Sequence, residues 1–250
     1  MNSAIINELF SVKNKVVLVS GASRGIGYYI ASQLTAIGAN VYGIGRSALD
    51  KQSDFEYIQC DLANYPQLHE SVDQITAKEG RIDILINAAG ISLRSEKNVY
   101  SRSNFIDTLN VNLVAINDCC RLVSDIMKDN GGGVMLNVTS IGSKLSFPEN
   151  PGYLASKAGL AALSKSLAYD LAPHRIRVNN LAPGYIHTDM TDKSFNNPVL
   201  SKERTDRMMI QRWGTVHDLL GSVIYLISDA SSYVTGIDLF VDGGWTSKGL

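Results

Sequence analysis

Hydrophobic positions along the chain follow two patterns that alternate from one end to the other. Short runs such as KVVLVS at 15–20 and GVMLNV at 133–138 are mostly apolar, which is typical of buried strands. Longer stretches between such runs repeat apolar residues at helical spacing. The pattern predicts strands at 15–20, 40–44, 55–60, 82–87, 133–138, 176–181 and 238–242. It predicts helices at 25–37, 64–79, 101–129, 151–172 and 215–228.

The alternation of apolar strands with helices predicts an α/β protein with a doubly wound parallel sheet, that is, a Rossmann fold of about seven strands with helices on both faces. No linker rich in Pro, Gly or Ser and no run of charge divides the chain, so residues 1–250 are expected to form a single domain. Ligands of such folds bind beyond the carboxyl ends of the strands. We therefore expect the functional residues to gather where strands end.

Composition and charge exclude several kinds of partner. The net charge is −1, with both signs scattered along the chain, which does not favour nucleic acid or a membrane surface as a partner. The N-terminal residues lack the pattern of a signal peptide, with Glu8 where apolar residues would be needed. The three cysteines, Cys60, Cys119 and Cys120, lack metal-ligand spacing and are expected to be buried, reduced thiols. A cytoplasmic protein with no bound metal is the expectation.

A glycine-rich segment, SGASRGIG, joins the first predicted strand to the first predicted helix. Gly21, Gly25 and Gly27 would allow a tight turn, close approach of the backbone to a pyrophosphate, and a helix N-terminus that favours negative charge. The spacing differs from the widespread G-x-G-x-x-G pattern, and turns also use glycine for purely structural reasons. Its position between strand and helix favours dinucleotide binding.

The end of the second predicted strand bears on which dinucleotide is bound. An acidic residue there would accept hydrogen bonds from the adenosine ribose, but the chain has Gly45 followed by Arg46. Arg46 and Arg24 could flank a 2′-phosphate through charge-assisted hydrogen bonds. NADP(H) is therefore favoured over NAD(H), the alternative being that both arginines are solvated surface charges.

Tyr153 and Lys157 form the candidate catalytic pair, because a separation of four residues places them on one face of a helix. Ser140 follows the strand at 133–138, at the edge of the sheet where a substrate would bind. A nearby ammonium and an oxidised nicotinamide are expected to lower the pKa of the tyrosine, ordinarily about 10. Ser140 would then hydrogen-bond the substrate oxygen while Tyr153 transfers a proton and the nicotinamide exchanges hydride. The alternative is that both are ordinary surface residues of a helix.

Taken together, these residues resemble the short-chain dehydrogenase/reductase family over nearly the whole chain. The matching features are SGASRGIG, CDL, NAAG, NVNL, Ser140, YLASK, NNLAPGYIHT and VDGGW. The resemblance implies that Asn112 completes a catalytic tetrad through a water relay, that Asp61 contacts the adenine, and that Lys157 also holds the nicotinamide ribose. Ser20 in place of threonine and Ala88 in place of asparagine are mild departures. The expected cofactor-binding residues are Gly21, Ser23, Arg24, Gly25, Ile26, Gly27, Arg46, Asp61, Leu62, Asn87, Ala88, Ala89, Gly90, Tyr153, Lys157, Pro183, Gly184, Ile186 and Thr188.

The substrate is less well defined by the sequence. The segment at about 185–212 is expected to be a mobile lid over the substrate. The substrate-facing candidates are Arg94, Lys144, Tyr185 and His187, with Leu145, Glu149 and Asn150 nearby. Their polar, cationic character suits a hydroxylated or carboxylated small molecule, with Arg94 either a carboxylate clamp or a solvated loop arginine.

The resemblance is strongest to sugar-acid enzymes like gluconate 5-dehydrogenase, and 3-oxoacyl-[acyl-carrier-protein] reductases are the alternative. It also implies a homotetramer or homodimer, built on the helices at 101–129 and 151–172. A non-catalytic dinucleotide sensor with the same fold is the alternative of another class. Neither the substrate nor the direction of reaction follows from the sequence.

Overall fold

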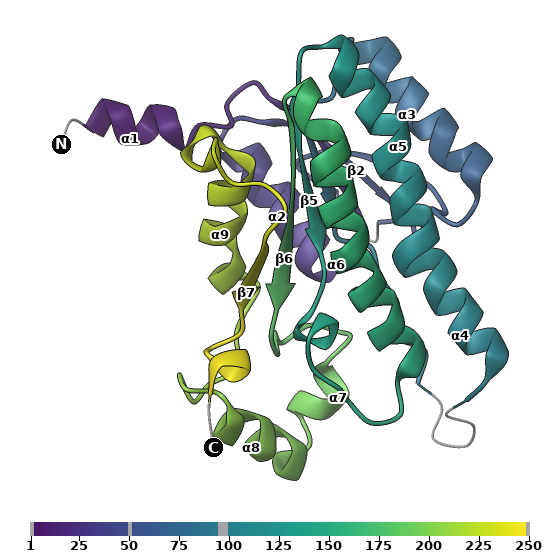
Figure 1. The fold of residues 1–250 in the computed structure, drawn as a ribbon, viewed down its shortest axis with the longest axis vertical. Helices are drawn as coiled ribbons and strands as arrows, with labels where there is room; N and C mark the ends of the chain where they lie inside the picture. The colour runs from purple at the N-terminus through teal and green to yellow at the C-terminus, as the bar shows by residue number, and fades with distance from the viewer. Residues whose placement is uncertain (1–2, 50–51, 95–99, 249–250) are drawn as a thin grey trace.

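A computed structural model describes residues 3–49, 52–94 and 100–248 and contains one parallel sheet of seven strands (Figure 1). The strand order is β3-β2-β1-β4-β5-β6-β7, and all pairs of neighbours are parallel. The strands are β1 (Val16–Ser20), β2 (Asn40–Gly45), β3 (Glu56–Gln59), β4 (Ile84–Asn87), β5 (Gly133–Val138), β6 (Ile176–Pro183) and β7 (Asp238–Val241). The predicted doubly wound fold and all seven strands are confirmed.

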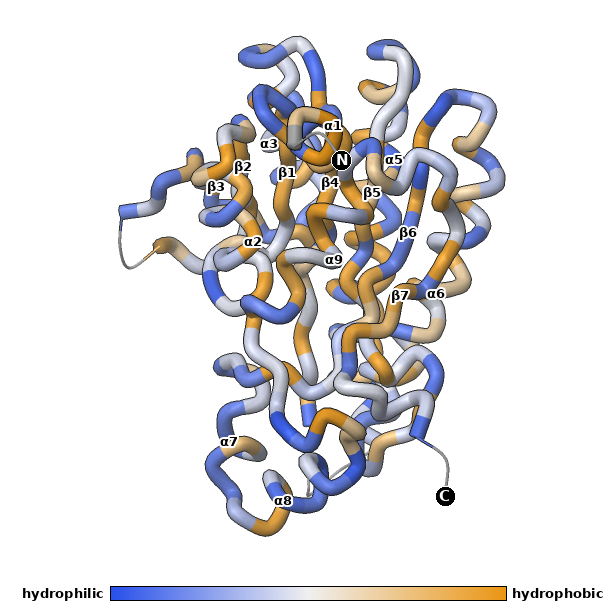
Figure 2. The backbone as a smooth tube through the Cα atoms, turned by 90° about the vertical axis from the view of Figure 1, so that its left-hand side faces the viewer, coloured by the Kyte–Doolittle hydropathy of each residue, from blue (hydrophilic) through white to orange (hydrophobic). Residues whose placement is uncertain are grey.

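Both faces of the sheet are covered by helices, as the continuous apolar strands require. On one face pack α3 (Tyr65–Glu79), α5 (Ala115–Asp129) and α6 (Pro151–Leu171), whose apolar residues share a core with β1, β4 and β5. On the other face pack α2 (Gly25–Ala36) and α9 (His217–Ile227). The central strands run through the most hydrophobic part of the molecule (Figure 2).

The strand order reverses between β1 and β4, where the chain leaves β1 toward β2 on one side and reaches β4 on the other. Loops that leave the carboxyl ends of these strands diverge at this point and leave a crevice, which is where ligands of doubly wound folds bind. The topology therefore locates a binding site before any side chain is considered.

The long helix predicted at 101–129 is interrupted in the structure. It consists of α4 (Arg102–Leu109), a π-helical turn η1 (Asn110–Val114) and α5 (Ala115–Asp129). A π-helical turn inserts one extra residue and rotates the side chains within it relative to the flanking helices. Asn112 lies in this turn and is fully buried, so the interruption directs its side chain inward.

Three helices were not predicted from the sequence: α1 (Ser3–Leu9), α7 (Asp192–Phe195) and α8 (Pro198–Arg207). None of the three has a buried face that would give helical periodicity, and α8 is largely hydrophilic (Figure 2). Short 3-10 turns complete the structure at Ile141–Ser143, Ala172–His174, Asp229–Ser231 and Trp245–Ser247. The helices α7 and α8 lie beyond the carboxyl ends of the strands (Figure 1).

Cys60, Cys119 and Cys120 are buried, unpaired thiols, as predicted. Burial raises the pKa of each thiol, that of Cys120 to about 12, which disfavours the reactive thiolate form. In the described part of the chain, no helix is long and apolar enough for a membrane crossing.

Candidate active site

A cleft opens at the carboxyl ends of β1, β2 and β4, at the reversal of strand order. Gly21 follows β1 with a φ of +73°, and a Cβ there would lie 2.6 Å from the backbone of Ala89. A Cβ at Gly27 would lie 2.3 Å from the carbonyl oxygen of Gly21. Glycine at both positions lets the β1–α2 loop pack against the end of β4. No side chain caps the N-terminus of α2, so its first backbone N–H groups are available to an anion.

Most of the predicted cofactor residues line this cleft. They are Gly21, Ser23, Arg24, Gly25, Ile26, Gly27, Arg46, Asp61, Leu62, Ala88, Ala89, Gly90 and Thr188. The remaining lining residues are Gly45, Ser47, Ile91, Val111, Asp189 and Met190. A glycine cradle in front of an uncapped helix N-terminus, with polar residues on both sides, fits the pyrophosphate and sugars of a dinucleotide.

Asn87 is not a lining residue of the cleft and instead ties the strand ends together. Its Oδ1 accepts a hydrogen bond from the Ser20 hydroxyl at 3.2 Å, and its Nδ2 donates to Asn137 Oδ1 at 2.9 Å. All three side chains are buried. This network fixes the carboxyl ends of β1, β4 and β5 relative to one another. Pro183 and Ile186 are also buried outside the lining of the cleft.

The end of β2 has little space for a side chain at Gly45. A Cβ at Gly45 would lie 2.8 Å from the Tyr57 hydroxyl, so an acidic side chain does not fit there without displacing Tyr57. Arg46 and Arg24 both line the cleft. Arg24 lies 3.9 Å from Asp189 across the cleft, and both side chains are largely exposed.

Ser140 and Tyr153 meet at the carboxyl end of β5. Ser140 directly precedes the turn Ile141–Ser143, and its hydroxyl accepts a hydrogen bond from the Gly142 N–H at 3.0 Å. Tyr153 lies in the first turn of α6. Burial raises the pKa of Tyr153, and a hydrogen bond with the Ser140 hydroxyl lowers it only in part.

Lys157 lies one turn further along α6 and is only 4% exposed. Its Nζ donates to the Val138 carbonyl oxygen at 2.7 Å and lies 5.8 Å from the centre of the Tyr153 ring. Burial lowers the pKa of Lys157 to about 8. Among the groups of the chain itself, desolvation of the phenol outweighs its hydrogen bond with Ser140, so the pKa of Tyr153 is raised. The expectation that Lys157 and an oxidised nicotinamide together lower this pKa stays a prediction.

Asn112 lies close to Lys157, and its side chain is hydrogen-bonded to the backbone of Ile91. Its Oδ1 accepts from the Ile91 N–H at 2.8 Å, and its Nδ2 donates to the Ile91 carbonyl at 2.9 Å and to Ser156 Oγ at 3.1 Å. A Cβ placed on Gly90 would lie 3.5 Å from both Asn112 Oδ1 and Lys157 Nζ. The structure thus brings together the four predicted catalytic residues from three separate segments.

A second cavity adjoins the cleft, and Met190 lines both. Ser140 and Tyr153 line this cavity, as do the predicted substrate residues Arg94 and Tyr185. Arg94 donates to the Pro148 carbonyl at 3.3 Å and lies 4.0 Å from the Glu149 carboxylate. The other lining residues are Ser92, Ile141, Phe147, Asn150, Gly184, Met190, Thr191, Ser194 and Arg204.

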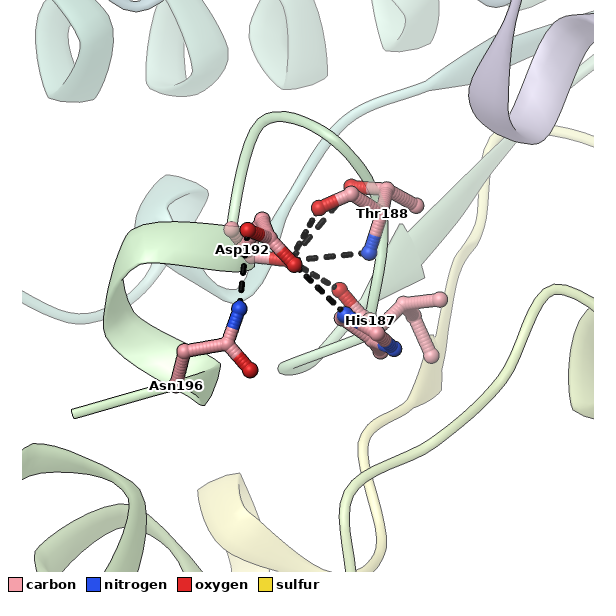
Figure 3. Close-up of polar contacts among 6 residues, drawn as sticks. His187, Thr188, Asp192 and Asn196 are labelled. Carbon is pink, nitrogen blue, oxygen red and sulfur yellow. Dashed lines mark hydrogen bonds and ion pairs between the residues drawn. The ribbon is translucent and has the colours of Figure 1, made fainter. Parts of the chain in front are cut away.

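Two predicted substrate residues, Lys144 and His187, lie outside the lining of this cavity. Lys144 Nζ lies 5.5 Å from the centre of the Phe240 ring. His187 is paired with Asp192 at 3.0 Å and stacks on Phe195 with ring centres 3.8 Å apart. Figure 3 shows the His187 ring turned toward the Asp192 carboxylate, which also accepts a hydrogen bond from Asn196 at 2.9 Å. His187 therefore stabilises the start of α7.

The sequence reasoning missed the aromatic cluster that supports the cavity. The Tyr185 ring lies 6.0 Å from Phe147, 5.3 Å from Trp213 and 4.9 Å from Trp245, measured between ring centres. These residues are scattered over the chain, so no local pattern could have grouped them. It also missed Arg204, since α8 shows no apolar periodicity. Only the tertiary structure brings these residues together around Tyr185.

The sequence of the chain is similar to those of known dehydrogenases and reductases. The family model described as Enoyl-(Acyl carrier protein) reductase matches residues 21–246. Gluconate 5-dehydrogenase of Gluconobacter oxydans (strain 621H) is 36% identical over 96% of this chain and 97% of its own length. A 3-oxoacyl-[acyl-carrier-protein] reductase of Staphylococcus epidermidis is 32% identical over 92% of this chain and 98% of its own.

A solved structure is similar over its whole length. It is the crystal structure of a gluconate 5-dehydrogenase from Burkholderia cenocepacia J2315 in complex with NADP and tartrate, with a TM-score of 0.92 and 31% identity, over 98% of this chain and 100% of that one. The chain belongs to the short-chain dehydrogenase/reductase family. Within that family it is an oxidoreductase that acts on CH–OH groups and uses a nicotinamide dinucleotide.

Proposed function

We propose that this protein interconverts the ketone and the secondary alcohol of a small hydroxylated carboxylic acid of the gluconate type, with NADP(H) as cofactor. The observation that carries the proposal is the composition of the cavity. It joins Ser140 and Tyr153 to two arginines, Arg94 and Arg204, and includes no Asp or Glu among its described lining residues. Such a cavity favours an anionic, hydroxylated substrate over a neutral apolar one.

The proposed chemistry assigns a separate role to each residue. Bound NADP(H) supplies or accepts the hydride at the substrate carbon. Tyr153 donates the proton to the carbonyl oxygen during reduction and takes it back during oxidation. Ser140 hydrogen-bonds the same oxygen and the Tyr153 phenol, which orients both.

Lys157 and Asn112 support this pair. The Lys157 ammonium is anchored on the Val138 carbonyl, close enough to the phenol for its charge to stabilise the phenolate that forms in the transition state. It also suits the ribose hydroxyls of the cofactor as a donor. Asn112 holds the backbone of Ile91, and so the segment between the two cavities, in place.

The preference for NADP(H) over NAD(H) belongs to the same proposal. Gly45 stands at the end of β2 in the position where an acidic residue would bind a ribose hydroxyl, and Arg24 and Arg46 line the cleft around it. Two guanidinium groups favour a 2′-phosphate. Three similar structures have NADP bound: the one described above and two described as a putative gluconate 5-dehydrogenase and a putative 2-deoxy-D-gluconate 3-dehydrogenase.

Residues 185–212 are proposed as the lid over the substrate, within a single domain spanning 1–250. In support, Tyr185, Met190, Thr191, Ser194 and Arg204 of this segment line the cavity. A cytoplasmic location, where such small acids and the reduced cofactor are available, completes the proposal.

The test is turnover by the purified protein with NADPH against keto-sugar acids, 3-oxoacyl thioesters and simple diketones, followed by the decrease in NADPH absorbance. Keto-sugar acids are expected to be reduced. Tyr153→Phe removes the proton donor and should lower kcat by about 100-fold or more. Tyr233→Phe is the control, because the Tyr233 side chain is fully exposed and lines neither the cleft nor the cavity.

The other outcomes are informative in different ways. Full turnover by Tyr153→Phe would contradict the acid/base role. Reduction of 3-oxoacyl thioesters alone would favour the fatty-acid-synthesis alternative, in line with the 32% identical reductase. Tight binding of NADPH with no turnover of any carbonyl would favour a dinucleotide sensor.

A further inference from the structure

The side chain of Arg204 reaches the substrate cavity from α8, a helix of the lid segment. It lines the same cavity as Ser140 and Tyr153. Its Nη1 atom is buried, yet it makes no hydrogen bond within the described part of the chain. Buried donors without a partner are rare in folded proteins, because desolvation is not offset, so an unpaired donor in a ligand cavity points to a ligand acceptor.

The guanidinium is held in place by aromatic rings. It lies over Tyr185, 4.6 Å from the ring centre, and 5.9 Å from the centre of the Trp213 ring. Trp213 is tied to the same helix through its indole N–H, which donates to the Ser201 carbonyl at 3.5 Å. Stacking on aromatic faces positions a guanidinium while leaving its edge donors free.

No ion pair neutralises Arg204 among the residues that the structure describes, although Glu203 and Asp206 are close to it in sequence. Arg94, the other arginine of the cavity, differs in this respect. Its guanidinium already bonds the Pro148 carbonyl and lies 4.0 Å from the Glu149 carboxylate. The positive charge of the cavity that is still available to a ligand is therefore mainly that of Arg204.

From these observations, and resting on the proposed function, we infer that Arg204 binds the carboxylate of the substrate and selects acids over neutral polyols. A carboxylate matches the fork of guanidinium donors, and it would satisfy the buried Nη1. The sequence had suggested Arg94 for this role. Because Arg204 belongs to the lid segment, a bound carboxylate also links that segment to the substrate.

The experiment measures binding and does not depend on turnover. The NADPH-loaded protein is titrated calorimetrically with gluconate and with glucitol, which has an uncharged hydroxymethyl group in place of the carboxylate. Arg204→Gln is expected to weaken gluconate binding by about tenfold or more, as for loss of a charged hydrogen-bonding partner, and to leave glucitol binding unchanged. Arg204→Lys keeps the positive charge but loses the paired guanidinium donors, so its affinity for gluconate should lie between that of wild type and that of Arg204→Gln.

Arg207→Gln is the matched control on the same helix. Its guanidinium lies 5.9 Å from the centre of the Trp245 ring and is outside the lining of the cavity, so gluconate affinity should stay at the wild-type value. Far-ultraviolet circular dichroism and thermal unfolding of each variant show whether α8 and the fold are retained. A loss confined to Arg204 variants that remain folded supports the inference.

Three results would overturn this inference. Wild type and Arg204→Gln could bind gluconate with equal affinity, the substitution could weaken glucitol binding as much as gluconate binding, or the wild-type protein could fail to bind gluconate. Equal weakening of both ligands would mean that the guanidinium only supports the aromatic cluster. Failure of the proposed function would give a different result from failure of this inference. If gluconate binding depends on Arg204 but no keto acid is reduced, the anion site stands and the catalytic proposal fails.

Discussion

At the scale of a single residue, the buried ammonium of Lys157 in the candidate active site lowers the stability of the fold. Its ammonium is buried with the Val138 carbonyl as its hydrogen-bond partner, and burial lowers its pKa to about 8. A buried ammonium with a neutral partner is unfavourable for folding. Functional sites commonly retain such groups at the expense of stability.

Lys157→Met is therefore expected to increase the free energy of unfolding at pH 7 while abolishing turnover. Between about pH 8 and 10.5 the unfolded chain keeps the proton on Lys157 and the folded chain has lost it, so wild-type stability rises with pH in this window. The difference in free energy of unfolding between Lys157→Met and wild type should therefore shrink by up to about 3 kcal/mol from pH 7 to 10.5, at 1.36 kcal/mol per pH unit. Urea unfolding of both proteins across this range measures it.

The exposed Lys165 on the same helix provides the control, because Lys165→Met removes an ammonium that pairs with Asp238 near the surface. Subtracting each variant from wild type cancels the titration of all other groups. A constant difference between wild type and Lys157→Met over the whole pH range would contradict the buried-ammonium account.

At the scale of elements, the end of β2 and the start of α2 together form the part of the cleft that would discriminate between the two dinucleotides. Gly45 ends β2 without a carboxylate, and the Tyr57 hydroxyl occupies the space that a side chain there would need. Arg24 precedes α2, and Arg46 follows β2. Two neighbouring elements of the chain thus place two cations on the lining of one cleft.

Arg46→Ala is expected to raise the Kd for NADPH by about tenfold or more and to change that for NADH by less than about threefold, since only NADPH carries the 2′-phosphate. Fluorescence titration with both cofactors measures this. Arg102→Ala, at an exposed position on α4, is the control. Equal effects on the two cofactors, or a wild-type preference for NADH, would show that Arg24 and Arg46 are surface charges only.

At the scale of the whole molecule, large apolar side chains are exposed on the helices that the family resemblance assigns to subunit contacts. Phe105 on α4 is 38% exposed, Val114 in η1 is 49% exposed, and Tyr169 on α6 is 84% exposed. Apolar side chains gathered on a few elements mark association surfaces more often than single exposed residues do. We propose that they are covered in a homotetramer.

Val114→Glu should then dissociate the assembly, because a carboxylate that is solvated in a single chain would be desolvated in the interface. Sedimentation equilibrium is expected to give four times the chain mass for wild type and a smaller mass for the variant. Val199→Glu, at a 66% exposed position on α8, should leave the mass unchanged. A monomeric wild type would contradict the proposal.

Features that depend on near neighbours in the chain could be predicted from the sequence. The strands are recognisable because burial on both faces requires continuous apolar runs, as in Val16–Ser20. Tyr153 and Lys157 share a helix face because of their spacing alone, and the glycines of the β1–α2 loop are needed for its local geometry. The fold class, the cofactor cleft and the candidate catalytic pair follow from such local patterns.

Only the tertiary structure decided how distant residues act on one another. Arg204 lies 64 positions from Ser140, and only folding of the whole chain brings both into one cavity. Likewise, desolvation, which depends on every segment packed around a group, lowers the pKa of Lys157 and raises that of Tyr153. A sequence carries local spacing directly, whereas burial and electrostatic fields arise only when the whole chain has folded.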